Sequence, residues 1–228
     1  MSAPPSRRRR HVVRTKTSAA VVEYVLDELF EGRLQSGDRI DLDEVCEVLG
    51  VSRLPVREAM VILERDGIVS TKYHRGVYVE PFDAESILDD FEIMGLLSGV
   101  ALRRLADKRT PETLAALEHL VDELRSANPR DQKHVYELVQ QIVELEHRAG
   151  GSRRLRAELR AHSGFLPKAF DIITGRRHAD TVKAHALVLR AIVAGDGEKA
   201  ARHRLEDFRD AGRRVVRELE RRGVISDS

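Results

Sequence analysis

The chain has 228 residues, of which 42% are hydrophobic and 34% are charged. That is enough for one large domain or two small ones, each with a buried core and a solvated surface. The net charge is only +1, and residues 1–82 carry 13 basic and 13 acidic side chains. A uniformly basic chain is therefore excluded, and binding to nucleic acid would require positive charge gathered on one face.

Cys46 is the only cysteine in the sequence. No disulfide can form within the chain, so a reducing, cytoplasmic location is expected. No apolar run approaches the roughly 18 residues of a membrane span. No signal-peptide type of apolar stretch follows the basic N-terminus either, so we expect no membrane partner.

Residues 1–16 are rich in Pro, Ser and Arg and show no hydrophobic periodicity. They are predicted to form a flexible basic arm, and the four arginines at positions 7–10 are either solvated or contact phosphates or a minor groove. Residues 17–30 carry apolar side chains at helical spacing. A shorter helix over residues 41–49 has Asp41 as its expected N-cap and ends at a glycine.

A third helix is predicted after Ser52, and it tolerates Pro55 because that residue lies in the first turn. Two extended runs follow, at residues 68–71 and 77–79, joined by the basic segment 72–76. They predict a β-hairpin with a basic tip. Helix, helix, turn, helix and hairpin in this order indicate a winged helix-turn-helix domain, assigned to residues 17–82.

The remaining residues, 83–228, repeat apolar side chains at helical spacing between short loop signals. About six helices of this length can form a bundle with an internal cavity. The predicted fold class is therefore mainly α: an N-terminal winged helix-turn-helix domain followed by an all-α domain for effector binding and dimerisation.

The start of the third helix and the hairpin tip carry the residues expected to bind double-stranded DNA. Arg53 and Arg57 lie four residues apart and therefore on one helical face, where they can contact guanine edges or phosphates. Such a pair is often ordinary surface charge, but a glycine turn precedes it and a basic hairpin follows. The predicted DNA-binding residues are Ser52, Arg53, Leu54, Arg57, Lys72, His74, Arg75 and Gly76.

Residues 32–79 resemble the DNA-binding domain of the GntR family of bacterial regulators. The matching pieces are Gly32, Gly37-Asp38, Leu49-Gly50-Val51-Ser52-Arg53, Pro55-Val56-Arg57-Glu58-Ala59, Leu63-Glu64, Asp66-Gly67 and Arg75-Gly76. The resemblance implies a homodimer that binds an inverted-repeat operator and represses transcription. It implies base or phosphate contacts for Arg53 and Arg57 and a wing contact for Arg75 and Gly76. Leu54 departs from the threonine more usual in the family.

Further matching features are the helix count, Leu105-Ala106, Pro111 at the start of the second helix, Ala191-Ile192 before Gly195-Asp196, and the following Ala200-Ala201. Through them residues 83–223 resemble, more loosely, the helical effector domain (FCD type) of the FadR-like branch. Many such domains hold a divalent metal with one Asp and three His, and use it with an Arg to bind a carboxylate. Here the four ligand positions fall on Val139, Val143, His185 and Asp207, and the family's Arg and Glu of the first helix fall on Met94 and Ser98. These six residues form the expected effector pocket.

Two aliphatic ligand positions make a poor site for a transition metal, so no cofactor is expected. His147 and His203 lie elsewhere on their helices. An apolar pocket with few polar groups suits a hydrophobic effector, such as a fatty acid or its acyl-coenzyme A thioester. A carboxylate effector, or a cavity filled by side chains that binds nothing, stays open.

Two other classes of function were weighed. An enzyme is not expected, because the sequence has no Gly-rich phosphate loop and no nucleophile motif. Glu144 stands three residues before His147, as in di-iron bundles, but a partner motif on another helix is not evident. The second alternative is a helical protein-interaction module with a vestigial DNA-binding domain.

Overall fold

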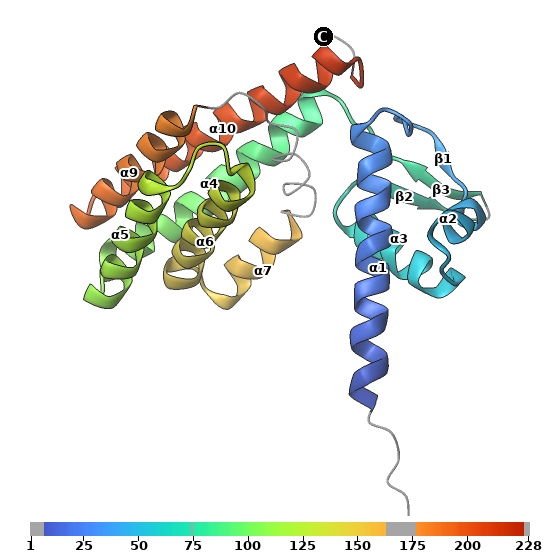
Figure 1. Ribbon diagram of the computed structural model, residues 1–228, viewed down its shortest axis with the longest axis horizontal. Helices are drawn as coiled ribbons and strands as arrows, with labels where there is room; N and C mark the ends of the chain where they lie inside the picture. The colour runs from blue at the N-terminus through green and yellow to red at the C-terminus, as the bar shows by residue number, and fades with distance from the viewer. Residues whose placement is uncertain (1–6, 74, 163–176, 226–228) are drawn as a thin grey trace, which may run out of the picture. The chain divides into compact units, whose positions relative to one another are not determined.

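The computed structural model describes residues 7–73, 75–162 and 177–225, with the backbone alone for residues 7–16. These residues form two compact units (Figure 1). One unit comprises the described residues up to Ala84 together with those from Leu219 to Ile225, and the other comprises Glu85–Glu218.

The N-terminal unit contains helices, a short strand and a β-hairpin in the order expected of a winged helix-turn-helix. The elements are α1 (Arg7–Phe30), β1 (Arg39–Ile40), α2 (Leu42–Leu49), α3 (Arg53–Arg65), β2 (Val69–Lys72) and β3 (Gly76–Val79). The three strands form an antiparallel sheet in the order β1-β3-β2, with Ile40 opposite Val77 and Val69 opposite Val79. The hairpin β2–β3 is the wing.

Local signals set the ends of α2 as predicted. The Asp41 carboxylate accepts hydrogen bonds from the backbone N–H groups of Asp43 and Glu44, which have no partner inside the helix. Gly50 ends the helix in the left-handed conformation, with φ of 62°. The turn between α2 and α3 is therefore fixed by the residues at its two ends.

The core of the unit lies between α1 and α3, which pack against each other. Each helix turns an apolar stripe inward, and the buried residues include Val21, Val25, Leu29, Val56, Ala59 and Leu63. Burying side chains of this size stabilises the fold by about 1.5–3 kcal/mol each. This packing leaves the opposite face of α3 exposed to solvent.

The structure differs from the sequence prediction at the two ends of this unit. Helix α1 begins at Arg7, inside the segment predicted to be a flexible arm. The segment lacks hydrophobic periodicity in the sequence, but arginine is a good helix former and lets a helix continue. At the other end, Val224 lies against Gly32 and Ile225 is buried, so residues 219–225 belong with this unit although the sequence assigned them to the helical domain.

The second unit is all helical, which confirms the predicted fold class. Its elements are α4 (Ala84–Lys108), α5 (Pro111–Ser126), α6 (Gln132–Gly150), α7 (Arg153–Ala161), α9 (His178–Val193) and α10 (Gly197–Arg222). The first residue of α4 and the last four residues of α10 belong to the N-terminal unit. The sequence predicts a further helical stretch from Leu155 to Phe170 and a loop at Thr174-Gly175; the first lies only partly within the described residues and the second lies outside them.

An apolar core holds this bundle together. It includes Leu102, Leu105, Leu117, Leu124, Leu138, Ile142, Val188 and Ile192. The end of α6 approaches α4 so closely that a methyl group on Gly150 would overlap the carbonyl oxygen of Ala101. No helix in the described part of the chain combines the length and the apolar character that crossing a membrane requires.

Candidate functional site

The exposed start of α3 is the first candidate site. Ser52, Arg53, Leu54 and Arg57 are all exposed, whereas Pro55 is buried. Ser52 occupies the N-cap position, but its hydroxyl makes no capping hydrogen bond. The first two turns of α3 therefore present backbone N–H groups, a hydroxyl and two guanidinium groups to the solvent.

Arg53 forms a bidentate ion pair with Asp43 of α2. Its Nε donates to Oδ1 and its Nη2 to Oδ2, both at 2.8 Å. The two side chains remain 67% and 61% exposed. Arg57, one turn further along α3, makes no hydrogen bond or ion pair with the described residues, so its guanidinium can engage a ligand without breaking a contact.

A cleft of about 200 Å³ separates α3 from the wing. Its lining includes Arg53 and Arg57 on one side and Gly76 on the other, with Arg39 of β1 between them. The sequence analysis missed Arg39. The sequence gives little indication of Arg39, because a strand of two residues shows no periodicity. Only the pairing of Arg39 with Tyr78 brings Arg39 beside the wing.

Gly76 is required for a reason that the sequence did not reveal. Its φ is 109°, a conformation that other residues rarely adopt, and a methyl group there would lie 2.9 Å from the Nε of Arg39. The positive φ is what requires glycine here, because the Arg39 side chain is exposed and flexible and can move away from an added methyl group.

The wing adds cations to the same unit. Lys72 lies over the ring of Tyr78, with its Nζ 4.5 Å from the ring centroid. The Tyr78 hydroxyl donates to the backbone oxygen of Arg75 at 3.1 Å. Tyr73 at the tip is 87% exposed, an aromatic residue that the sequence analysis did not single out. His74, which the sequence predicts to contact DNA, lies outside the described residues.

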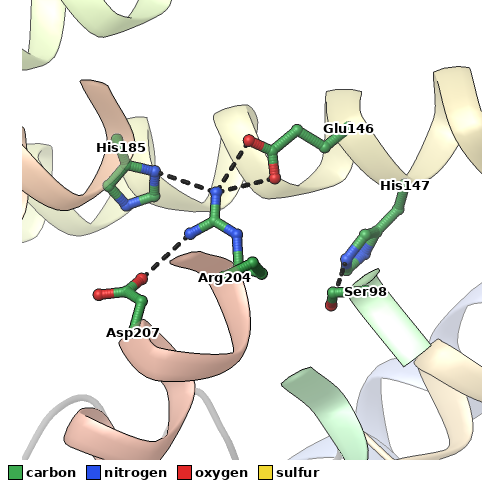
Figure 2. Close-up of polar contacts among 6 residues, drawn as sticks. All are labelled: Ser98, Glu146, His147, His185, Arg204 and Asp207. Atoms are coloured by element: carbon green, nitrogen blue, oxygen red, sulfur yellow. Dashed lines mark hydrogen bonds and ion pairs between the residues drawn. The ribbon is translucent and has the colours of Figure 1, made fainter. Parts of the chain in front are cut away.

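The second candidate site is a polar cluster inside the helical unit, centred on Arg204 of α10 (Figure 2). Arg204 is 1% exposed. Its Nη2 donates to both carboxylate oxygens of Glu146 on α6 at 2.8 Å, and its Nη1 donates to Asp207 at 3.0 Å. The Nδ1 of His185, on α9, lies 3.4 Å from the same Nη2. Three helices thus converge on one guanidinium group.

The charges of this cluster depend on one another. Burial lowers the pKa of Arg204, but the carboxylates of Glu146 and Asp207 outweigh this effect and raise the pKa above its ordinary value. Burial raises the pKa of Glu146, and the charge of Arg204 opposes that rise. A guanidinium group can only donate, so the Nδ1 of His185 accepts from Arg204 and the proton of the neutral imidazole ring lies on Nε2.

A second polar contact lies nearby. The Ser98 hydroxyl and the His147 Nε2 are 2.8 Å apart (Figure 2). Burial, together with the charge of Arg204, lowers the pKa of His147 to about 4. This histidine is therefore neutral at neutral pH.

The six residues of the expected effector pocket are only partly brought together. His185 and Asp207 meet through Arg204, and Ser98 contacts His147. Met94 is buried, whereas Val139 packs against the apolar core of the bundle. Val143 is half-buried.

The residues present do not fit the divalent metal that the family resemblance implies. The guanidinium of Arg204 already lies among Glu146, His185 and Asp207, the three groups that could otherwise donate to a cation. Within the described ranges, no group of three or more His, Cys, Asp or Glu side chains could hold a metal ion.

The sequence analysis missed Glu146 and Arg204, although a signal for both existed. Arg204 follows Ala200 and Ala201 at helical spacing, and Glu146 stands four residues after Ile142. Both charged residues therefore occupy core-facing positions of amphipathic helices, where an unpaired charge would be costly. Such positions indicate that a buried partner exists, but not which residue it is.

A winged helix-turn-helix with an exposed cationic face, followed by a helical bundle with a polar centre, defines a class of two-domain regulatory proteins. The family model described as "Bacterial regulatory proteins, gntR family" matches residues 17–79, and the model of the FCD domain matches residues 89–209. The chain therefore belongs to the GntR family and carries an FCD domain.

Three similar proteins illustrate the range of the family. An uncharacterised HTH-type transcriptional regulator of Mycobacterium tuberculosis is 41% identical over 155 residues, which cover 68% of this chain and 63% of that protein. A probable repressor of a D-xylose utilisation operon from Paenarthrobacter nicotinovorans is 29% identical over 98 residues, 43% of each chain. The crystal structure of a GntR regulator from Rhodococcus sp. RHA1 shares the fold at 22% identity, with a TM-score of 0.56, covering 87% of this chain and 97% of that one.

Proposed function

We propose that this protein is a transcriptional repressor that binds an inverted-repeat operator as a homodimer. Two observations carry the proposal: the exposed Arg39, Arg53 and Arg57 line one cleft, and the wing beside it carries the exposed Lys72 and Arg75. These arginines and Lys72 gather positive charge locally within residues 1–82, which carry equal numbers of basic and acidic side chains. Concentrated charge is what binding to phosphates requires.

The recognition step follows from the geometry of α3. The N-terminal residues of such a helix reach base edges when the helix lies in the major groove, and here those residues are exposed. Arg57 has no competing partner in the described part of the chain, so it can contact a guanine or a phosphate directly. Lys72 and Arg75 of the wing then contact the adjacent sugar-phosphate backbone.

Homodimerisation is part of the proposal because one winged helix reads few base pairs. Two copies related by a two-fold axis would read two half-sites of an inverted repeat and multiply the selectivity. Sedimentation of the protein with a labelled operator duplex would measure the stoichiometry. Two chains per duplex are expected, and one chain per duplex at saturation would refute the dimer.

The test of DNA binding is fluorescence anisotropy with the DNA upstream of the gene at several salt concentrations. The wild type is compared with Arg57→Ala, and with Arg65→Ala as a control at the far end of the same helix, where the arginine pairs with Asp66. We expect Arg57→Ala to weaken binding by about 1–3 kcal/mol and Arg65→Ala to have little effect. Equal affinities for all three proteins would remove α3 from the interface.

For the helical domain we propose a hydrophobic effector, a fatty acid or its acyl-coenzyme A thioester, that releases the operator. Aliphatic side chains at positions 94, 139 and 143 support an apolar ligand. The paired state of Arg204 supports it too, because that guanidinium already holds two carboxylates of its own chain. A carboxylate ligand would have to displace one of them.

A titration distinguishes the ligand classes. Fatty acids and acyl-coenzyme A thioesters of increasing length are added to the protein–operator complex, with a small dicarboxylate, with and without zinc, as the comparison. Release that strengthens with chain length supports the proposal. Release by the dicarboxylate with zinc would contradict it, and the absence of any response would favour a bundle filled by its own side chains, as the packing of Val139 suggests.

A further inference from the structure

The ion pair between Asp43 and Arg53 joins an acidic residue to the DNA-facing surface of α3. Asp43 is fixed in place because its backbone N–H donates to the N-cap carboxylate of Asp41 at 2.9 Å. From the first turn of α2 its own carboxylate reaches across to Arg53. An acidic group at a surface meant for phosphates lowers general affinity for DNA, so its presence there requires an explanation.

The pattern of hydrogen bonds supplies one. A guanidinium group has five N–H bonds, and Asp43 takes one from Nε and one from Nη2. The remaining three lie on Nη1 and the outer side of Nη2. Two parallel N–H bonds on that edge match the O6 and N7 acceptors of guanine in the major groove. Asp43 therefore leaves available the edge of Arg53 that can read a base.

The pair contributes little to the stability of the fold. Both side chains are more than half exposed, and exposed ion pairs stabilise proteins weakly even when their geometry is good. The ion pair instead restricts the rotamers of Arg53. Without it, this long side chain would lose its rotamer entropy only when it binds DNA. The Asp43 charge also opposes a rotamer change of Arg53 toward a phosphate, because that change would leave the Asp43 carboxylate unpaired beside the DNA.

We propose that Asp43 is a specificity-determining positioning residue, which holds Arg53 to read one guanine in each half-site of the operator. This inference rests on the proposed function. It adds the base that Arg53 recognises and the residue that makes the contact selective.

The test is a panel of operator duplexes in which each G·C pair of the half-site is replaced in turn by A·T. Affinities are measured for the wild type, Asp43→Ala, Asp43→Asn and Arg53→Ala. Glu47→Ala is the matched control, because it also removes an exposed acidic residue of α2 but one that makes no contact with Arg53 among the described residues. Thermal unfolding of each variant checks that it is folded.

We expect the wild type to lose about 5- to 150-fold in affinity when the guanine read by Arg53 is replaced. Asp43→Ala should lose most of this discrimination at that one position while it binds all duplexes more tightly. Its log affinity against log salt should steepen by up to about 0.9, as Arg53 turns to a phosphate. Asp43→Asn, which retains one acceptor, should lie between the two, and Glu47→Ala should tighten binding with an unchanged base profile.

The outcomes separate the inference from the proposed function. If Arg53→Ala binds every duplex as the wild type does, Arg53 does not read DNA and the proposed recognition mode fails. If Arg53→Ala loses discrimination at one base while Asp43→Ala keeps it, DNA recognition stands and the positioning role of Asp43 is overturned. Stronger discrimination in Asp43→Ala would also overturn it, because Asp43 would then compete with the base.

Discussion

At the scale of single residues, the helical unit contains a buried ion pair between Arg204 and Glu146. Removing one partner of a buried pair leaves an uncompensated charge, which costs about 3–5 kcal/mol. We therefore expect Arg204→Met to lower the free energy of unfolding by that amount, measured by circular dichroism in urea.

The double variant Glu146→Leu with Arg204→Met is the control for this prediction. It removes the Glu146 charge together with that of Arg204 and keeps the volume, so it should recover the part of the loss that comes from Glu146, while Asp207 still loses its contact with Arg204. A single variant as stable as the wild type would contradict the buried pair.

His147 gives the helical unit a specific dependence on pH. Its pKa is about 4 in the folded protein and 6.5 in an unfolded chain, so below pH 6.5 the unfolded state binds a proton that the folded state does not. Stability is thus unaffected above pH 6.5 and falls as the pH drops toward 4, by up to about 3 kcal/mol from this group.

The measurement is urea unfolding of the wild type and of His147→Gln between pH 4 and pH 7.5. Glutamine keeps a hydrogen-bonding partner for Ser98 but does not titrate. The stability difference between the two proteins should be constant above pH 6.5 and should shift in favour of the variant below it. Parallel curves over the whole range would contradict this prediction, because they would show that His147 binds its proton at the same pH in the folded and unfolded states.

At the scale of elements, the approach of α6 to α4 depends on Gly150. A methyl group there overlaps the Ala101 carbonyl, which is backbone and cannot rotate away. We expect Gly150→Ala to cost about 1–3 kcal/mol or more through overpacking. Gly50→Ala is the comparison, because Gly50 has open space around it and a substitution there meets only the strain of the left-handed conformation, about 1 kcal/mol. Equal losses in thermal unfolding would mean that α6 moves aside without cost.

Much of the element pattern could be predicted from local residues. Asp41 caps α2, and Thr110 with Pro111 begins α5, because each signal acts on its own neighbours in the chain. The start of α1 could not be predicted, because residues 7–16 show no hydrophobic periodicity in the sequence. The centre of the second site could not be predicted either: Glu146 and Arg204 are 58 residues apart, and their meeting depends on how three helices pack.

At the scale of the whole molecule, the last residues of the chain return to the N-terminal unit. Ile225 is 8% exposed there, and Val224 lies against Gly32. We expect Ile225→Ala to destabilise this unit by about 2 kcal/mol or more, seen as a lower melting temperature and a weaker affinity for DNA at 37 °C. Val193→Ala, a substitution of an exposed aliphatic residue in α9, is the control. An unchanged melting temperature for Ile225→Ala would mean that the C-terminal segment is not part of the unit in solution.

The central claim is that two copies of the winged helix-turn-helix unit read an inverted repeat through α3 and the wing. Hydroxyl-radical footprinting of the DNA upstream of the gene tests it most directly, with Arg57→Ala alongside the wild type. We predict two protected half-sites related by symmetry, with centres one helical turn or a multiple of it apart, about 10 base pairs each, and a higher protein concentration for the same protection by the variant. A single protected patch, or the same protection by Arg57→Ala at the same protein concentration, would contradict this mode of binding.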